Sequence, residues 1–158
     1  MMVRDGFIAA VEVVDNSADQ RSDDDVLLPG LIDLQVNGYG GVDFNAADLT
    51  AADVRTVVER LWAVGVTGFC PTVITGPPDR MLASVRAITK ACAQDDDVAD
   101  AVLGIHLEGP WISPDDGARG AHPRDAVRAP DPAELRALTD GGDVPSSRWR
   151  RSYPVPPT

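Results

Sequence analysis

The feature that most constrains the fold is an alternation of strand and helix patterns along the middle of the chain. Residues 31–37, 67–75 and 102–108 have the alternation or the β-branched composition of strands. Residues 50–65 and 77–92, which lie between them, carry apolar side chains at helical spacing. Parallel strands need crossovers of about a dozen residues, so this order predicts an α/β fold with a parallel sheet.

The ends of the two helical segments carry their own signals. Thr50 can cap the first helix, with Asp53 three residues later in a variant of the capping box, and Gly65 ends it. Pro77 and Pro78 open the second helix. Its expected buried stripe consists of Leu82, Val85, Ile88, Thr89 and Cys92.

Acidic and turn-forming residues mark the remaining boundaries. The acidic run at residues 95–97 is expected to close the second helical unit, and the acidic stretch 16–25 is expected to be a loop. A last helix is expected to start at Asp131, with Pro132 in its first position. Residues 3–14 combine a turn signal with a β-rich run, which predicts a short hairpin.

Two of the expected strands carry a polar face at the point where each strand ends. Gln35 and Asn37 share one face of the first strand, and His106 and Glu108 share one face of the third. In a parallel α/β barrel, the side chains at the carboxyl ends of the strands form the active site. These four residues are therefore the first candidates for a functional site.

Each candidate has two interpretations. An imidazole and a carboxylate at a strand end suit a metal ligand or a general base, so Glu108 is a candidate for either role; the alternative is a structural carboxylate that hydrogen-bonds a neighbouring loop. Gln35 and Asn37 are amides, which are weak metal ligands and could form a hydrogen-bond network instead. His122 lies in a loop rich in glycine and proline, where it could bind an anionic or carbonyl-bearing ligand or face solvent.

The acidic composition excludes some classes of partner. The 158 residues include 25 acidic and 14 basic side chains, which give a formal net charge of −11. Nucleic acids and anionic membranes both require clustered lysine and arginine, so neither is an expected partner. The chain has no apolar run of about 18 residues and no signal-peptide pattern at its start, so we expect a cytoplasmic protein with reduced Cys70 and Cys92.

Taken in order, the motifs resemble the N-acetylglucosamine-6-phosphate deacetylases, a family of the amidohydrolase superfamily. The matching segments are LPGLIDLQVNG (28–38), GGVDFN (40–45), GVTGFCPT (65–72), HLEGPW (106–111) and GAHP (120–123). Most amidohydrolases carry His-x-His on the first strand, where this chain has Gln-x-Asn. Gln35 and Asn37 therefore resemble the vestigial second-metal positions of the deacetylase subgroup.

For the fold, the resemblance implies the N-terminal part of a TIM-like (β/α)8 amidohydrolase barrel with a remnant of a small β-sandwich domain. Residues 1–28 would belong to the sandwich and residues 29–144 to the barrel. Residues 145–158 contain three arginines and no acidic residue, unlike the family. A GC-rich back-translation of this tail gives a strand and an acidic turn in another frame. We therefore expect a frameshifted tail, with a natural short tail as the alternative.

For the function, the resemblance implies hydrolysis of N-acetylglucosamine 6-phosphate to glucosamine 6-phosphate and acetate, a step of amino-sugar catabolism. In the family, a divalent cation such as zinc or iron, one per subunit, polarises the acetamide carbonyl and lowers the pKa of its water. Glu108 would be a ligand of this metal, and Ala121 and His122 would bind the phosphosugar. The resemblance also implies a homodimer.

One departure from the family is large. Its two histidine ligands and its general-base aspartate would lie beyond residue 144, where this chain has no counterpart. Because a catalytic zinc site needs about three protein ligands, we expect the chain to be an inactive fragment of the enzyme. Two alternatives stay open, namely another amidohydrolase that acts on a different amide, and a non-catalytic fragment.

Overall fold

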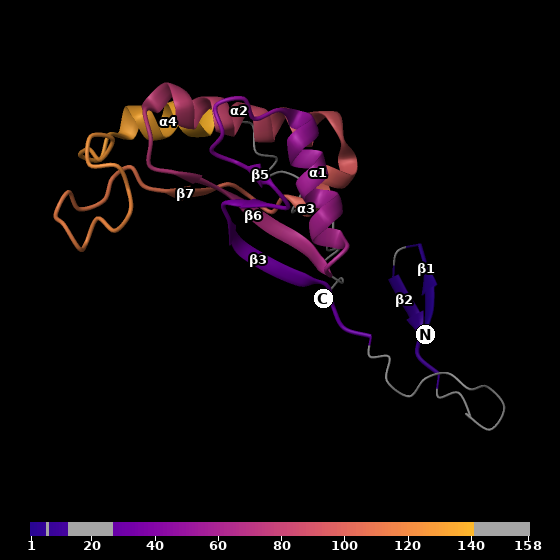
Figure 1. The fold of residues 1–158 in the computed structure, drawn as a ribbon. Helices are drawn as coiled ribbons and strands as arrows, with labels where there is room; N and C mark the ends of the chain where they lie inside the picture. The colour runs from indigo at the N-terminus through magenta and orange to yellow at the C-terminus, as the bar shows by residue number, and fades with distance from the viewer. Residues whose placement is uncertain (6, 13–26, 141–158) are drawn as a thin grey trace, which may run out of the picture.

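A three-stranded parallel sheet lies at the centre of the computed structural model, which describes residues 1–5, 7–12 and 27–140. Its strands, in the order β3–β6–β7, are β3 (Leu31–Val36), β6 (Val66–Ile74) and β7 (His106–Glu108). The helices that connect them lie on one side of the sheet (Figure 1); they are α1 (Ala51–Trp62), α2 (Pro78–Gln94) and α3 (Asp96–Ala101). The expected α/β fold with a parallel sheet is confirmed.

Short elements extend this unit at the ends of β3 and β7. An antiparallel pair, β4 (Gly38–Tyr39) and β5 (Val42–Asp43), follows β3. A long loop follows β7 and leads to α4 (Pro132–Asp140), which packs against α2. The Asp131 side chain accepts a hydrogen bond of 2.8 Å from the Ala133 N–H, so α4 begins where the aspartate and proline predict.

The N-terminus of α1 confirms the predicted capping box. The Thr50 hydroxyl accepts from the Asp53 N–H at 3.3 Å, and the Asp53 carboxylate accepts from the Thr50 N–H at 2.9 Å. Two donors that a helix leaves unpaired at its start are thus satisfied reciprocally. Gly65 follows the helix with a φ of +86°, in the region that favours glycine. The local sequence therefore determines both ends of α1.

The buried side of α2 differs from the expected stripe. Leu82 and Thr89 are only half-buried. The residues buried in this helix are Met81, Ser84, Val85, Ile88, Ala91 and Cys92. The buried side includes two small residues, Ser84 and Ala91, which a pattern based on large apolar side chains does not register. The stripe is therefore turned by about one residue from the prediction.

Two predictions between α2 and β7 have different outcomes. The acidic run 95–97 closes the second helical unit as expected, since α2 ends at Gln94 with Asp95 as its C-cap. The Asp95 carboxylate also accepts from the N–H groups of Asp97 and Val98 at 2.9 and 3.3 Å and so caps α3, which was not expected. The third strand does not extend over 102–108. Val102, directly after α3, forms an isolated bridge with Phe69, and continuous pairing begins only at β7.

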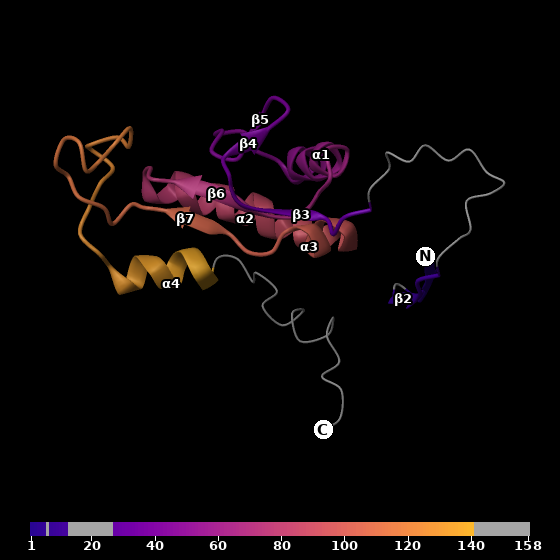
Figure 2. The same ribbon diagram turned by 90° about the horizontal axis from the view of Figure 1, so that it is seen from below.

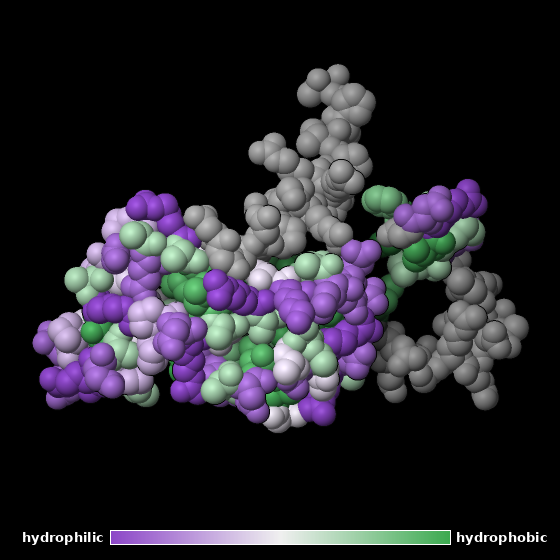
Figure 3. Space-filling view, turned by 90° about the horizontal axis from the view of Figure 1, so that it is seen from above, coloured by the Kyte–Doolittle hydropathy of each residue, from purple (hydrophilic) through white to green (hydrophobic). Residues whose placement is uncertain are grey.

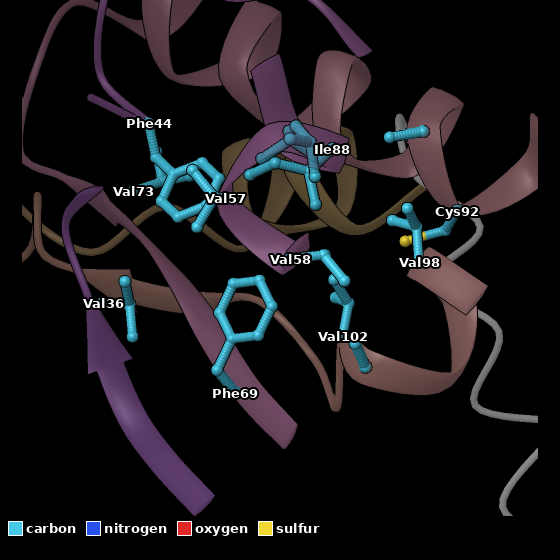
Figure 4. Packing of buried hydrophobic residues seen from close by; sticks show 14 of the residues in the cluster. Val36, Phe44, Val57, Val58, Phe69, Val73, Ile88, Cys92, Val98 and Val102 are labelled. Carbon is cyan, nitrogen blue, oxygen red and sulfur yellow. The ribbon is translucent and has the colours of Figure 1, made fainter. Parts of the chain in front are cut away.

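The hydrophobic core lies between the sheet and its helices. Figure 4 shows Val36 from β3 and Phe69 from β6 facing Val57 and Val58 of α1. The rings of Phe44 and Phe69 stack with their centroids 6.0 Å apart. Of the two cysteines, Cys92 is buried in this core, whereas Cys70 is half-buried.

The first half of β3 and the N-terminal hairpin present apolar residues to solvent. Ile32 and Leu34 are 64% and 68% exposed. The predicted hairpin is present as antiparallel β1 (Met2–Arg4) and β2 (Phe7–Ala10), and it lies apart from the sheet in both ribbon views (Figures 1 and 2). Its hydrophobic residues are visible at the right-hand end of Figure 3. These surfaces have no covering element within the described residues.

Some predictions fall on residues 16–25 and 145–158, which lie outside the described residues. Within the described part of the chain, no helix has the length and hydropathy needed to cross a membrane.

Candidate functional site

Three of the candidate residues meet at the end of the sheet where the strands terminate. The Gln35 amide donates to one oxygen of the Glu108 carboxylate at 3.1 Å, reaching across β6 from β3 to β7. The other oxygen of Glu108 lies 3.5 Å from Nε2 of His122. The His122 side chain is 18% exposed and that of Glu108 33%. Residues 73 and 14 positions from Glu108 are thus brought together around one carboxylate.

The backbone around Glu108 is held by β6. Ile74 pairs with Glu108 in the parallel ladder, and the Thr75 hydroxyl donates to the Glu108 carbonyl at 3.1 Å. The next residue, Gly109, has a φ of +90°, and a Cβ placed there would lie only 2.0 Å from the Thr75 hydroxyl oxygen. Only glycine fits this turn, which therefore sets the direction in which Glu108 leaves the strand.

Electrostatic contacts within the loop after β7 position His122. The Arg119 guanidinium donates to the His122 carbonyl and also to the Asp116 carboxylate, the latter at 2.8 Å. Arg124 donates to the same Asp116 oxygen at 2.6 Å. The two arginines hold the pKa of Asp116 below its usual value. A charged network thus surrounds the backbone of the candidate substrate-binding residue.

The remaining candidates do not join this cluster. Asn37 is exposed and borders an open hollow of about 460 Å³ beside β4 and β5, and its backbone carbonyl accepts from the Phe44 N–H at 2.9 Å. Ala121 is exposed on the loop. His106 turns toward β3, where Nδ1 lies 3.2 Å from the Leu34 carbonyl. Of the predicted residues, the structure brings together Gln35, Glu108 and His122.

One polar residue beside the site had no separate prediction. Asn45 donates its side-chain amide to the Thr72 carbonyl at 3.0 Å, and its side-chain oxygen accepts from the Ile74 N–H at 2.9 Å. It therefore fastens the segment after β5 to the end of β6. The only sequence signal for it is its position at the end of the GGVDFN motif.

A metal site is only partly represented. Within residues 1–5, 7–12 and 27–140 there is no group of three or more histidine, cysteine, aspartate or glutamate side chains that could hold a metal ion. Glu108 has one imidazole nearby and an amide on its other oxygen. A catalytic zinc centre requires about three protein ligands, so these residues do not by themselves fit a metal.

Known proteins of similar sequence are named as deacetylases of N-acetylated sugar phosphates. The chain is 42% identical to the human N-acetylglucosamine-6-phosphate deacetylase over 115 residues, which are 71% of this chain and 27% of the human protein. It is 34% identical to the N-acetylgalactosamine-6-phosphate deacetylase of Escherichia coli O157:H7 over 142 residues, covering 87% of this chain and 35% of that protein. No family model matches the chain.

Solved structures agree with this similarity. The N-acetylglucosamine-6-phosphate deacetylase of Pasteurella multocida superimposes with a TM-score of 0.63 at 34% identity, over 73% of this chain and 29% of that one. The enzyme from Mycobacterium smegmatis gives a TM-score of 0.61 at 33% identity, with 73% and 30% covered. The chain thus spans about a third or less of the proteins it matches. It is homologous to part of the N-acetylglucosamine-6-phosphate deacetylases, which have an amidohydrolase fold.

Proposed function

We propose that this chain represents part of a hydrolase that removes the acetyl group from N-acetylglucosamine 6-phosphate, giving glucosamine 6-phosphate and acetate. The observation that carries the proposal is that Gln35 and His122 both contact the Glu108 carboxylate, in a chain homologous to such enzymes. The phosphosugar would be the substrate, and the whole protein would act in amino-sugar catabolism as a cytoplasmic homodimer.

The proposed parent fold is a TIM-like barrel that carries a small β-sandwich. The parallel order β3–β6–β7, with helices on one side, is what consecutive strand–helix units of such a barrel produce. Residues 29–144 would form part of the barrel, and residues 1–28 a remnant of the sandwich. The antiparallel β1–β2 hairpin supports the second assignment. Residues 145–158 would be an aberrant tail.

The chemistry that this chain can supply is binding and orientation. Gln35 fixes one oxygen of Glu108 by donating to it, which leaves the other oxygen directed at His122. His122 can hydrogen-bond an oxygen of the phosphosugar, and Ala121 offers backbone beside it. For the whole protein we propose one divalent cation per subunit, zinc, iron or similar. Glu108 would be one ligand, and the others would come from outside the described residues.

A second substrate has a specific observation in its favour. The relative that covers the largest share of this chain among those described above is named for N-acetylgalactosamine 6-phosphate. The two sugars differ in the configuration of one hydroxyl group, so a site that recognises the acetamide and the phosphate can accept both. Any assay should therefore offer both phosphosugars.

The decisive experiment grafts residues 27–140 into the human homologue in place of the matching segment. We expect the chimera to release acetate from N-acetylglucosamine 6-phosphate, and Glu108→Gln in it to reduce kcat/KM by roughly 100-fold or more because a ligand of the metal is lost. Arg136→Met, which removes an exposed arginine of α4, is the matched control and should keep the activity. A folded chimera that hydrolyses neither phosphosugar would contradict the proposal.

The unmodified 158-residue chain gives the complementary test. We expect it to release no acetate from either phosphosugar and to bind no stoichiometric zinc, because the described residues do not complete a metal site. Measurable turnover by the purified chain would overturn the view that it is an inactive fragment.

A further inference from the structure

A single arginine closes the neck of the loop that carries His122. The Arg128 N–H donates to the Pro110 carbonyl at 3.2 Å, so the two ends of the intervening segment lie side by side. The Arg128 guanidinium donates at 2.6 Å to the Ala126 carbonyl of the same loop and at 2.9 Å to the Gly76 carbonyl just beyond β6. The loop is thereby attached to the end of the strand that supports Glu108.

The same guanidinium is paired with a carboxylate of α4. Arg128 donates to both oxygens of Glu134, with Nε 3.0 Å from each, and the Trp111 indole N–H donates to Glu134 at 3.2 Å. The side chains of Arg128 and Glu134 are 25% and 13% exposed. The Arg128 pairing, followed by the Trp111 contact, holds the pKa of Glu134 below its usual value. A bidentate, largely buried pair of this kind has one geometry and is among the stronger polar contacts.

The position of this pair decides what it can control. Arg128 contacts its own loop, the end of β6 and α4, whereas it does not contact His122. Within the loop, the His122 imidazole contacts the Glu108 carboxylate, and the His122 carbonyl accepts a hydrogen bond from Arg119. Arg119 belongs to the loop and moves with it. Among the side-chain hydrogen bonds described here, Arg128 forms the one from the loop to the end of β6, and Arg128 and Trp111 link the loop to Glu134 of α4.

We propose that Arg128 is a positioning residue, which holds the loop so that the His122 imidazole lies against Glu108. Its relevance to catalysis rests on the proposed function, since His122 is there a substrate-binding residue. The geometric claim is independent of that function, because it concerns only the distance between the imidazole and the carboxylate. Lysine cannot replace Arg128 fully, since it lacks the planar fork that serves Glu134 and two carbonyls together.

The accessibility of His122 in the full 158-residue chain tests this proposal. Diethyl pyrocarbonate acylates exposed, unprotonated imidazoles, and the chain has two histidines, so His106 serves as the internal reference. We expect Arg128→Met to raise the ratio of the His122 rate to the His106 rate by roughly threefold or more, as the loop opens locally. Arg128→Lys should give a smaller rise. Peptide mass spectrometry measures both rates.

The control variants separate local release from unfolding. Arg136→Met removes an exposed arginine of α4, the helix that carries Glu134, and should leave the ratio unchanged. If Arg128→Met loses its helical circular dichroism, Glu134→Gln is used instead, because it removes the charge of Glu134 but keeps its shape. The same ratio of the His122 rate to the His106 rate is then measured in that variant. An unchanged ratio in folded Arg128 or Glu134 variants, or an equal rise in Arg136→Met, would overturn the proposal. None of these readouts requires acetate release, so failure of the proposed function would be seen separately.

Discussion

The two halves of β3 carry the same pattern of apolar residues but differ in how far those residues are buried. Val36, near its carboxyl end, is 5% exposed and belongs to the same core cluster as Phe69 and the buried residues of α1. Leu34, two residues earlier, is 68% exposed, and Ile32 is similar. Regular alternation would assign all three to the same side, but the pairing of β3 with β6 shifts register between Asp33 and Val36. Burial therefore depends on the local course of the strand and on the elements beside it, and the covered and bare halves of β3 should respond differently to substitution.

The largest contrast is expected between Phe69→Ala and Leu34→Ala. Phe69 is fully packed in the core, so its removal should cost about 3–5 kcal/mol of the free energy of unfolding. Leu34 makes little contact, and its truncation should cost no more than about 0.5 kcal/mol. Urea unfolding followed by circular dichroism measures both. Comparable losses would mean that the bare half of β3 is covered in solution.

A smaller contrast is expected between two glycines that have nearly the same φ but different surroundings. Gly109 has a φ of +90° and faces Thr75 closely, whereas Gly117 has a φ of +94° and open space. Alanine at Gly117 should cost about 1–2 kcal/mol, the conformational penalty alone. Alanine at Gly109 should cost more, since the Thr75 hydroxyl must also move. Equal midpoints in urea would show that the crowding at Gly109 is relieved without cost.

The cap of α1 tests how firmly this helix is held in the core that it shares with Val36. Thr50→Ala should lower the free energy of unfolding by about 1 kcal/mol at pH 7, whereas Thr56→Ala, on the same helix, is the control. Hydrogen bonds from Thr50 hold the pKa of Asp53 below its ordinary value. Their stabilisation is present above the unfolded pKa and is lost as pH falls through the folded one. The gap between the variant and the wild type should therefore narrow below about pH 4.

The smallest effect on stability, but a visible one on association, is expected at the bare half of β3. Exposed apolar residues on an open strand edge favour association between chains. Replacing Ile32 and Leu34 by serine should reduce the self-associated fraction in sedimentation velocity and leave the urea midpoint nearly unchanged. If the double variant unfolds instead, these side chains are part of a packed interior.

The features that could be predicted from the sequence were those determined by residues close together in the chain. Strand alternation, the Thr50 capping box and Gly65 after α1 all act within a few positions. Contacts at longer range could not be predicted: Asp95, which caps α3 locally, also accepts from Arg55, 40 residues earlier, at 2.6 Å. An acidic run looks the same in sequence whether it faces solvent or begins a helix.

The site shows the same division. The motifs indicated Gln35, Glu108 and His122, and the structure places them together. The link from Arg128 to Gly76 and Glu134 could not be predicted, because no spacing in the sequence associates these residues. Such a link depends on where β6 and α4 end in space. Sequence motifs thus indicate the residues of the site, and the fold supplies what holds them.

The side chain of Asn45 takes the place of a strand beside the end of β6. Its side-chain amide gives one hydrogen bond to the Thr72 carbonyl and takes one from the Ile74 N–H, as a peptide group of a neighbouring strand would do. One side chain thus imitates a strand beside the last residues of β6. Exchanging its nitrogen for an oxygen, as in Asn45→Asp, would set a carboxylate against a carbonyl. The geometry of this edge therefore depends on the chemical identity of a single atom.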